Sequence, residues 1–164
     1  MSFRPKDLVL GAASGFAASF AMDRATNAYL ARQSERSLRR QDELAPGGAP
    51  ALFIRRAAGL SGVEVGIERS EAYALVLHRT LTSAYGAAAA LVSRGRSPMR
   101  AALLASTAAL VLVDEGLPAL RIVPAPQEWP LESHARGVIG HITLGLGIGA
   151  LLSVADRLAK LDER

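Results

Sequence analysis

The segment that decides the fold runs from Gly137 to Ala155 and reads GVIGHITLGLGIGALLSVA. Its only titratable residue is His141, and the other side chains are apolar, small or uncharged. A helix needs about 20 predominantly apolar residues to cross the hydrocarbon core of a bilayer. Together with the residues just before it, this segment reaches that length. It predicts a membrane-spanning helix over about 134–155.

Three further apolar segments, over about 8–29, 71–92 and 100–120, predict helices of the same kind. They approach the required length only if a few ionisable residues lie at membrane depth, so an Ala-rich helical bundle in water is the alternative. Hydrophobic residues make up 50% of the chain, but aromatic residues only 5%. Ala and Gly bury little apolar area and allow helix backbones to approach closely, which favours packing within a membrane.

These segments predict an all-α protein, a four-helix transmembrane bundle that forms a single domain over residues 1–164. One long outer loop, over about 31–70, is expected between the first two helices. Positive charges in short flanking segments mark the cytoplasmic side of a membrane protein. Arg4 and Lys6 precede the first span, and further basic residues follow the second and fourth spans. We therefore expect both termini inside (N-in, C-in) in a multi-pass protein of a bacterial inner (plasma) membrane.

Charge and composition limit the classes of partner. Lys and Arg total 19 against 15 Asp and Glu, which gives a net charge of +4. The basic residues gather between the apolar runs, so the expected partner is the lipid bilayer, with a homo-oligomer or a membrane partner protein also possible and no nucleic acid. The sequence contains no cysteine, which excludes disulfides and thiolate metal sites. No cofactor is expected, and no catalytic constellation of an enzyme is visible.

Five ionisable residues form the candidate site. With alternating topology they all fall in the outer half of the bundle: Asp23, His78, Asp114, Glu115 and His141. Charge at membrane depth is costly and needs a partner. Because His titrates near neutral pH, a His/carboxylate cluster predicts proton sensing or proton transport. Two His and an acid are also suitable ligands for Zn or Fe, but these residues come from separate helices and no local motif singles out a metal.

Small residues at four-residue spacing accompany the titratable residues of three spans. Residues at this spacing share one helix face and let two helices approach closely. The stripe therefore turns its titratable residue toward the bundle interior. The predicted packing positions are Gly11, Gly15, Ser19, Gly86, Gly137, Gly145 and Gly149.

The same residues admit a structural interpretation. Asp23, next to Arg24, suits an ordinary helix end at the headgroups. Glu115 is followed by Gly-Leu-Pro, which is typical of a helix C-terminus. For His141, an interhelical hydrogen bond is a sufficient explanation. In this alternative the protein has a structural or assembly role, and its polar residues only lock the helices together.

Several short motifs together resemble the YagU family of small inner-membrane proteins. They are Gly11-x-x-x-Gly15-x-x-x-Ser19, Ala84-Tyr85-Gly86, Asp114-Glu115-Gly116-Leu117-Pro118 and Gly140-His141. The resemblance covers the four predicted spans and not the segment 31–70. It implies a four-span inner-membrane protein and brings no catalytic residues with it.

Overall fold

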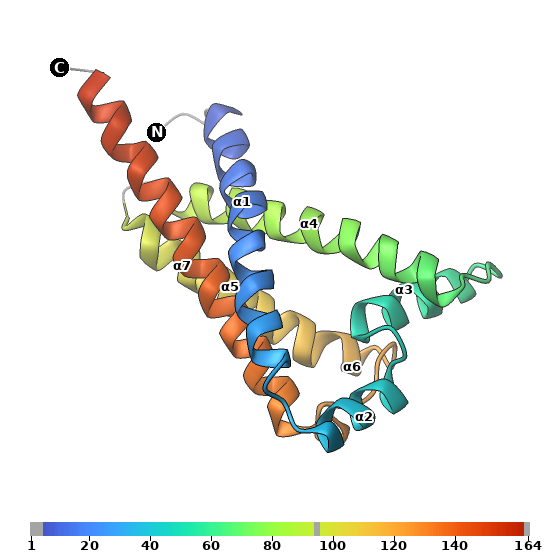
Figure 1. Ribbon diagram of the computed structural model, residues 1–164. Helices are drawn as coiled ribbons and strands as arrows, with labels where there is room; N and C mark the ends of the chain where they lie inside the picture. Colours follow the sequence, from blue (N-terminus) through green and yellow to red (C-terminus); the bar gives the residue numbers. More distant parts are fainter. Residues whose placement is uncertain (1–4, 94–95, 163–164) are drawn as a thin grey trace.

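The computed structural model describes residues 5–93 and 96–162, with the side chains of Asp114, Glu115 and Asp162 outside the description. This part of the chain is all-helical (Figure 1). The long helices are α1 (Pro5–Leu30), α4 (Ile67–Val92) and α7 (Leu131–Asp162). The shorter ones are α2 (Glu35–Leu44), α3 (Ala49–Gly59), α5 (Pro98–Val111) and α6 (Leu117–Ala119).

The segment expected to be a long loop, 31–70, is largely helical, because capping and turn residues divide it into α2 and α3. Ser34 caps α2, since its hydroxyl accepts a backbone N–H one turn further on at 3.3 Å. Gly47 and Gly48 then take φ values of 78° and 90°, which favour glycine. Pro50 follows in the first turn of α3, where its missing N–H costs nothing.

The helix predicted over about 100–120 is not a single regular α-helix in the structure. After α5 the chain forms a π-helical turn, Leu112–Gly116, and then continues as α6. A π turn accommodates an extra residue, so the side chains beyond it point in shifted directions. Asp114 and Glu115 lie in this turn. A 3₁₀ turn, Pro126–Glu128, precedes α7.

The helices form two arms that meet at the α1–α4 crossing (Figure 1). In one arm α1 and α7 lie side by side and antiparallel, and α5 packs against α7. The C-terminal half of α4 crosses α1. Its N-terminal half diverges, packs against α3 and forms the other arm with it. The short helices α2, α3 and α6 lie at the open end between the arms. The start of α1, the end of α7 and the junction of α4 with α5 lie at the other end.

Glycine allows the backbones of α1 and α4 to touch where they cross. A Cβ atom on Gly11 would lie 2.6 Å from the carbonyl oxygen of Gly86. A Cβ on Gly15 would overlap the carbonyl group of Thr82. A backbone carbonyl cannot rotate away as a flexible side chain can, so the crossing requires glycine at these positions.

The interface between α5 and α7 uses glycine in the same way. A Cβ on Gly145 would lie 3.2 Å from the Cα of Leu103, and one on Gly149 would lie 2.8 Å from the Cα of Met99. Gly137, two turns before Gly145 on the predicted stripe, lines a cavity. The glycine stripe of α7 therefore packs against α5 at Gly145 and Gly149 and borders a cavity at Gly137.

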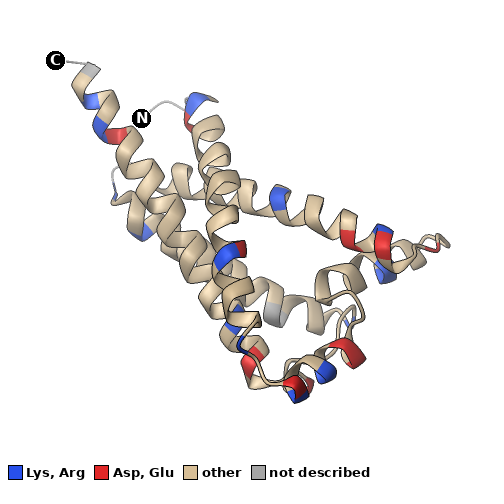
Figure 2. Ribbon diagram, viewed as in Figure 1, with Lys and Arg blue, Asp and Glu red and all other residues tan. Residues whose placement is uncertain are grey.

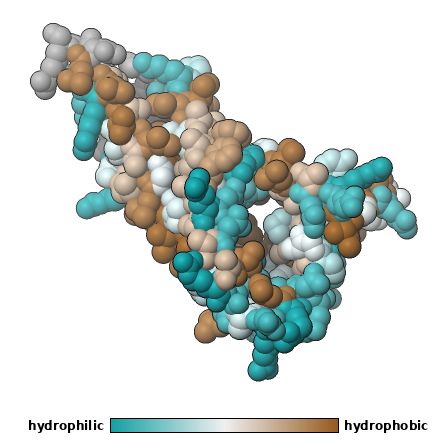
Figure 3. Space-filling view, viewed as in Figure 1, coloured by the Kyte–Doolittle hydropathy of each residue, from teal (hydrophilic) through white to brown (hydrophobic). Residues whose placement is uncertain are grey.

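Small side chains fill the interior, and large apolar side chains lie outside. The central cluster comprises Ala18, Ala89, Ala90, Ala102, Leu144, Ile148 and Leu152. By contrast, Phe16, Phe20 and Ile142 are each about half exposed, at 47%, 49% and 51%. Figure 3 shows the resulting hydrophobic surface along the arm of α1 and α7 and hydrophilic surface over α2. A core of alanine gains less from the hydrophobic effect than one of leucine and phenylalanine.

Within the described residues, one helix is long and apolar enough to cross a membrane. It covers Leu131–Leu161 in α7, and its most apolar window of 18 residues has a mean hydropathy of 1.9. The helix Pro98–Val111 is apolar but shorter. By the same criterion α1 and α4 are not candidate spans.

We expect Gly15→Ala to lower the free energy of unfolding by about 1–3 kcal/mol, because the added methyl group meets backbone. The matched control is Gly59→Ala in α3, where an added Cβ has nothing within 4 Å. That control should be neutral or slightly stabilising. Thermal unfolding followed by circular dichroism measures both variants. Equal stability of the two would contradict the α1–α4 backbone contact.

Candidate functional site

Three charged or titratable side chains meet beside the α1–α4 crossing. Arg79 on α4 donates hydrogen bonds to the Asp23 carboxylate and to the Ser19 hydroxyl, both on α1. The Nε2 atom of His78 lies 3.2 Å from the other oxygen of the same carboxylate. The guanidinium carbon of Arg79 also lies 4.2 Å from the ring centroid of Phe20, which is a cation–π contact.

The geometry distinguishes the two contacts of Asp23. Arg79 bonds directly to one oxygen, whereas His78 has no well-directed hydrogen bond from its buried Nε2. We therefore treat the His78–Asp23 contact as an electrostatic pairing. The side chains of Arg79, His78 and Asp23 are 18%, 28% and 33% exposed. Such a partly buried ion pair is shielded from solvent more than a surface pair, without the full desolvation cost of a dry one.

His141 lies apart from this cluster. It is on α7, its ring lies beside the backbone of Ser106, and it is within electrostatic range of His78. Its Nδ1 atom is buried and has no hydrogen-bond partner among the described residues. The structure therefore brings Asp23 and His78 together and places His141 as a neighbour, without direct contact to the carboxylate. The side chains of Asp114 and Glu115 lie outside the described part of the chain.

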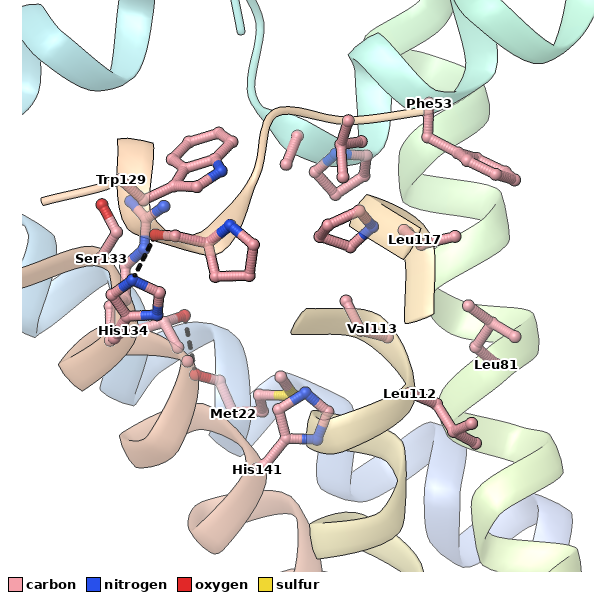
Figure 4. Close-up of a pocket in the computed structure, with 18 of the residues that line it drawn as sticks. Met22, Phe53, Leu81, Leu112, Val113, Leu117, Trp129, Ser133, His134 and His141 are labelled. Atoms are coloured by element: carbon pink, nitrogen blue, oxygen red, sulfur yellow. Dashed lines mark hydrogen bonds between the residues drawn. The ribbon is translucent and has the colours of Figure 1, made fainter. Parts of the chain in front are cut away.

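A cavity of about 600 Å³ lies between the arms, next to the cluster (Figure 4). Its walls come from α1, α3, α4, α7 and the segment 112–129. In Figure 4, Leu81, Leu112 and Phe53 form one side, and Trp129, Ser133 and His134 form the other. His141 lines it nearer to α5. A cavity of this size matches those that hold small ligands.

Sequence reasoning missed the functional side chains that depend on contacts between helices. Arg79 was not assigned to the site, and Ser19 was assigned to packing alone. The signal for Arg79 was a charge within an apolar helix, which needs a partner. Ser133 and Arg136, which line the cavity, carried no motif.

The described side chains include no cluster of three or more His, Asp or Glu close enough to hold a metal ion. Asp23 and His78 together would supply only two ligands to a metal ion. The cluster instead offers a permanently charged cation, a carboxylate and an imidazole that can take up a proton. These groups support charge compensation and proton binding between two helices.

The chain matches no family model, no curated protein and no solved structure. The resemblance to the YagU family therefore stays a prediction from the short motifs.

We expect Asp23→Asn and Arg79→Gln each to lower stability by about 1–3 kcal/mol, because each leaves the other charge without its partner. Solvent screening of Asp23 keeps the effect toward the lower end. The double variant should lose less than the sum of the two single losses. Arg24→Gln, an exposed arginine on the same helix, is the control and should be near neutral. Strict additivity would contradict the interhelical ion pair.

Proposed function

We propose that the chain is a multi-span membrane protein whose α1–α4 junction responds to protonation of His78. The observation that carries the proposal is the Asp23 carboxylate, which is shared by Arg79 and His78 between the two helices. The four crossing segments are α1, α4, α7 and the run from α5 through α6. The expected location is a bacterial inner membrane, with both termini on the cytoplasmic side.

The distribution of side chains supports the membrane location. Large exposed apolar residues continue along α7, with Leu146, Leu151 and Val154 all over 40% exposed. An acyl-chain environment accepts such a surface, whereas water disfavours a contiguous apolar face. The 26-residue helices α1 and α4 are each about 39 Å long at 1.5 Å per residue. That length exceeds the roughly 30 Å of a hydrocarbon core.

The placement of charge supports the orientation. In Figure 2, charged residues gather around α2, α3 and the start of α4 at one end, and near both termini at the other. The stretch between is mostly uncharged, apart from charges on α1 and α4. Lys6, Arg100 and Arg157 all belong to the terminal end, which matches a cytoplasmic face.

Protonation of His78 changes the balance of charge at the junction. With a neutral imidazole, the charges of Asp23 and Arg79 compensate each other. A proton on His78 places a second cation beside Arg79, against a carboxylate that is already paired. His141 on α7 adds a second imidazole within electrostatic range and no compensating negative charge. Acidification through the range in which His titrates should therefore weaken the α1–α4 junction.

A structural role is the second candidate. Arg79 already satisfies Asp23 and also contacts Ser19 and Phe20, so the cluster suffices to lock α1 onto α4 without any response to protons. The two candidates differ in pH dependence. A lock contributes stability at every pH at which Asp23 is ionised, whereas a sensor changes near neutral pH.

The four-span topology predicts the labelling of single cysteines, which the natural sequence lacks. Cys at Ser97 should react only from the cytoplasmic side, and Cys at Gln127 only from the outside. Both positions are exposed. The protein should also remain in the membrane pellet after a carbonate wash. Recovery without detergent would contradict the membrane location, and labelling of both positions from one side would contradict four spans.

The pH response predicts a difference between His78→Gln and the parent. In nonionic detergent, the parent should be less stable at pH 5 than at pH 8. Protection of the amides over 11–23 against hydrogen exchange, corrected for the intrinsic rate at each pH, should be lower at pH 5. His78→Gln should lose most of that difference. His134→Gln, which changes a histidine outside the cluster, should keep it. A parent with the same stability and the same corrected protection at both pH values would leave only the structural role.

A further inference from the structure

In the described lining of the cavity between the arms, mostly apolar side chains surround one arginine. Its lining includes leucines from α1, α4 and the π-helical turn, with aromatic cover from Phe53 and Trp129. Arg136 on α7 is the one permanently charged residue among the described residues that line it. No Asp or Glu belongs to that described lining. The cavity therefore combines an apolar interior with a localised positive charge.

Arg136 is half-buried and has no charged partner in the described part of the chain. By contrast, Arg79, which is also partly buried, bonds to Asp23 and Ser19. A buried guanidinium without an anion is costly, because it loses water and gains no opposite charge. Among the described residues no carboxylate compensates Arg136, and an anion that enters the cavity can do so.

Two polar atoms in the same cavity also lack partners among the described residues. They are the Ser133 hydroxyl oxygen and His141 Nδ1, both fully buried. Ser133 lies three residues before Arg136, so the two side chains lie on neighbouring positions of one helix face. His141 lies about 12 Å further along the axis, toward the interior. A buried hydroxyl without a partner beside an uncompensated guanidinium marks the place for a polar headgroup.

We propose that the cavity binds a single-chain anionic amphiphile, a long-chain carboxylate. The carboxylate accepts hydrogen bonds from the guanidinium of Arg136, whose planar fork suits two-point binding of a carboxylate. The hydroxyl of Ser133 donates a further hydrogen bond to it. The acyl chain lies against Leu81, Leu112 and Phe53 on the opposite wall (Figure 4). The headgroup contacts of this site use other residues than the ion pair at the His78 junction, and the proposal goes beyond the function proposed above.

The shape and lining of the cavity select this class of ligand. A free inorganic anion would leave the apolar walls unfilled, and a neutral hydrocarbon would leave Arg136 uncompensated. A cavity of about 600 Å³ lies within the range that holds one small ligand. That volume suits one acyl chain better than a whole two-chain lipid.

The only tryptophan of the chain, Trp129, lines the cavity and reports on its occupancy. We would titrate the full-length protein, in nonionic detergent, with a brominated long-chain fatty acid and with its methyl ester. Bromine quenches tryptophan fluorescence at short range. We expect saturable quenching by the acid and at least about tenfold weaker binding of the ester, which lacks the charge. Inorganic phosphate at the same concentration should not displace the acid.

Two variants distinguish the effect of the positive charge at the cavity from that of a positive charge elsewhere on α7. Arg136→Gln should weaken binding of the acid at least about tenfold and leave the ester unchanged, whereas Arg157→Gln, exposed on the same helix, should alter neither. The acid should raise the melting temperature of the parent and not that of Arg136→Gln. Equal binding of acid and ester by the parent, displacement of the acid by phosphate, or unchanged binding to Arg136→Gln would each overturn the proposal. The pH response of His78 is measured without the ligand, so failure of this proposal is distinguishable from failure of the function proposed above.

Discussion

The direct contact between the backbones of α1 and α4 is the constraint on which the rest of the structure depends. Gly11, Gly15 and Gly86 remove the side chains that would keep the two helices apart. The crossing then brings Asp23 and Arg79 from sequence positions far apart into one ion pair. Because the helices cross instead of running parallel, α4 diverges from α7 beyond the ion pair, and the cavity opens in the angle between them (Figure 1).

Close packing of small residues determines which forces stabilise the contacts between the helices. Dispersion between touching backbones and interhelical polar contacts stabilises such an interface, and these terms do not require water. The hydrophobic effect contributes less, because the interior contains Ala18, Ala89 and Ala102 and not large side chains. The large apolar residues remain on the outside. This division of roles is the one expected where lipid and not water surrounds the helices.

Much of the fold follows from the sequence, because helix formation and small-residue spacing are local properties. The apolar run around His141 predicted a helix within α7, and the spacing of Gly11 and Gly15 predicted a packing face that the structure places against α4. The all-helical fold predicted from these patterns is confirmed for the described residues. A long loop was predicted over about 31–70 where the structure has α2 and α3, because a charge-rich segment interrupted by Gly and Pro resembles a solvated loop.

The candidate site was harder to derive, because it depends on which faces of distant helices meet. Asp23 and His78 were selected from their depth in predicted spans, but the carboxylate's direct partner, Arg79, follows only from the crossing angle. The π-helical turn also redirects the residues after Val111, which no periodicity in the sequence reveals. The cavity depends on the divergence of α4 from α7, a property of the whole assembly.

The two proposed sites share a single turn of α1, which gives the molecule a physical route between them. Asp23 joins α4 in the ion pair, while Met22 and Thr26 on the adjoining faces line the cavity. A ligand in the cavity between the arms would therefore contact the same turn of α1 that the ion pair joins to α4. Any coupling between the two sites must be reciprocal in free energy. A ligand that stabilises the α1–α4 junction would lower the affinity of His78 for a proton. Protonation of His78 would in turn weaken binding of that ligand.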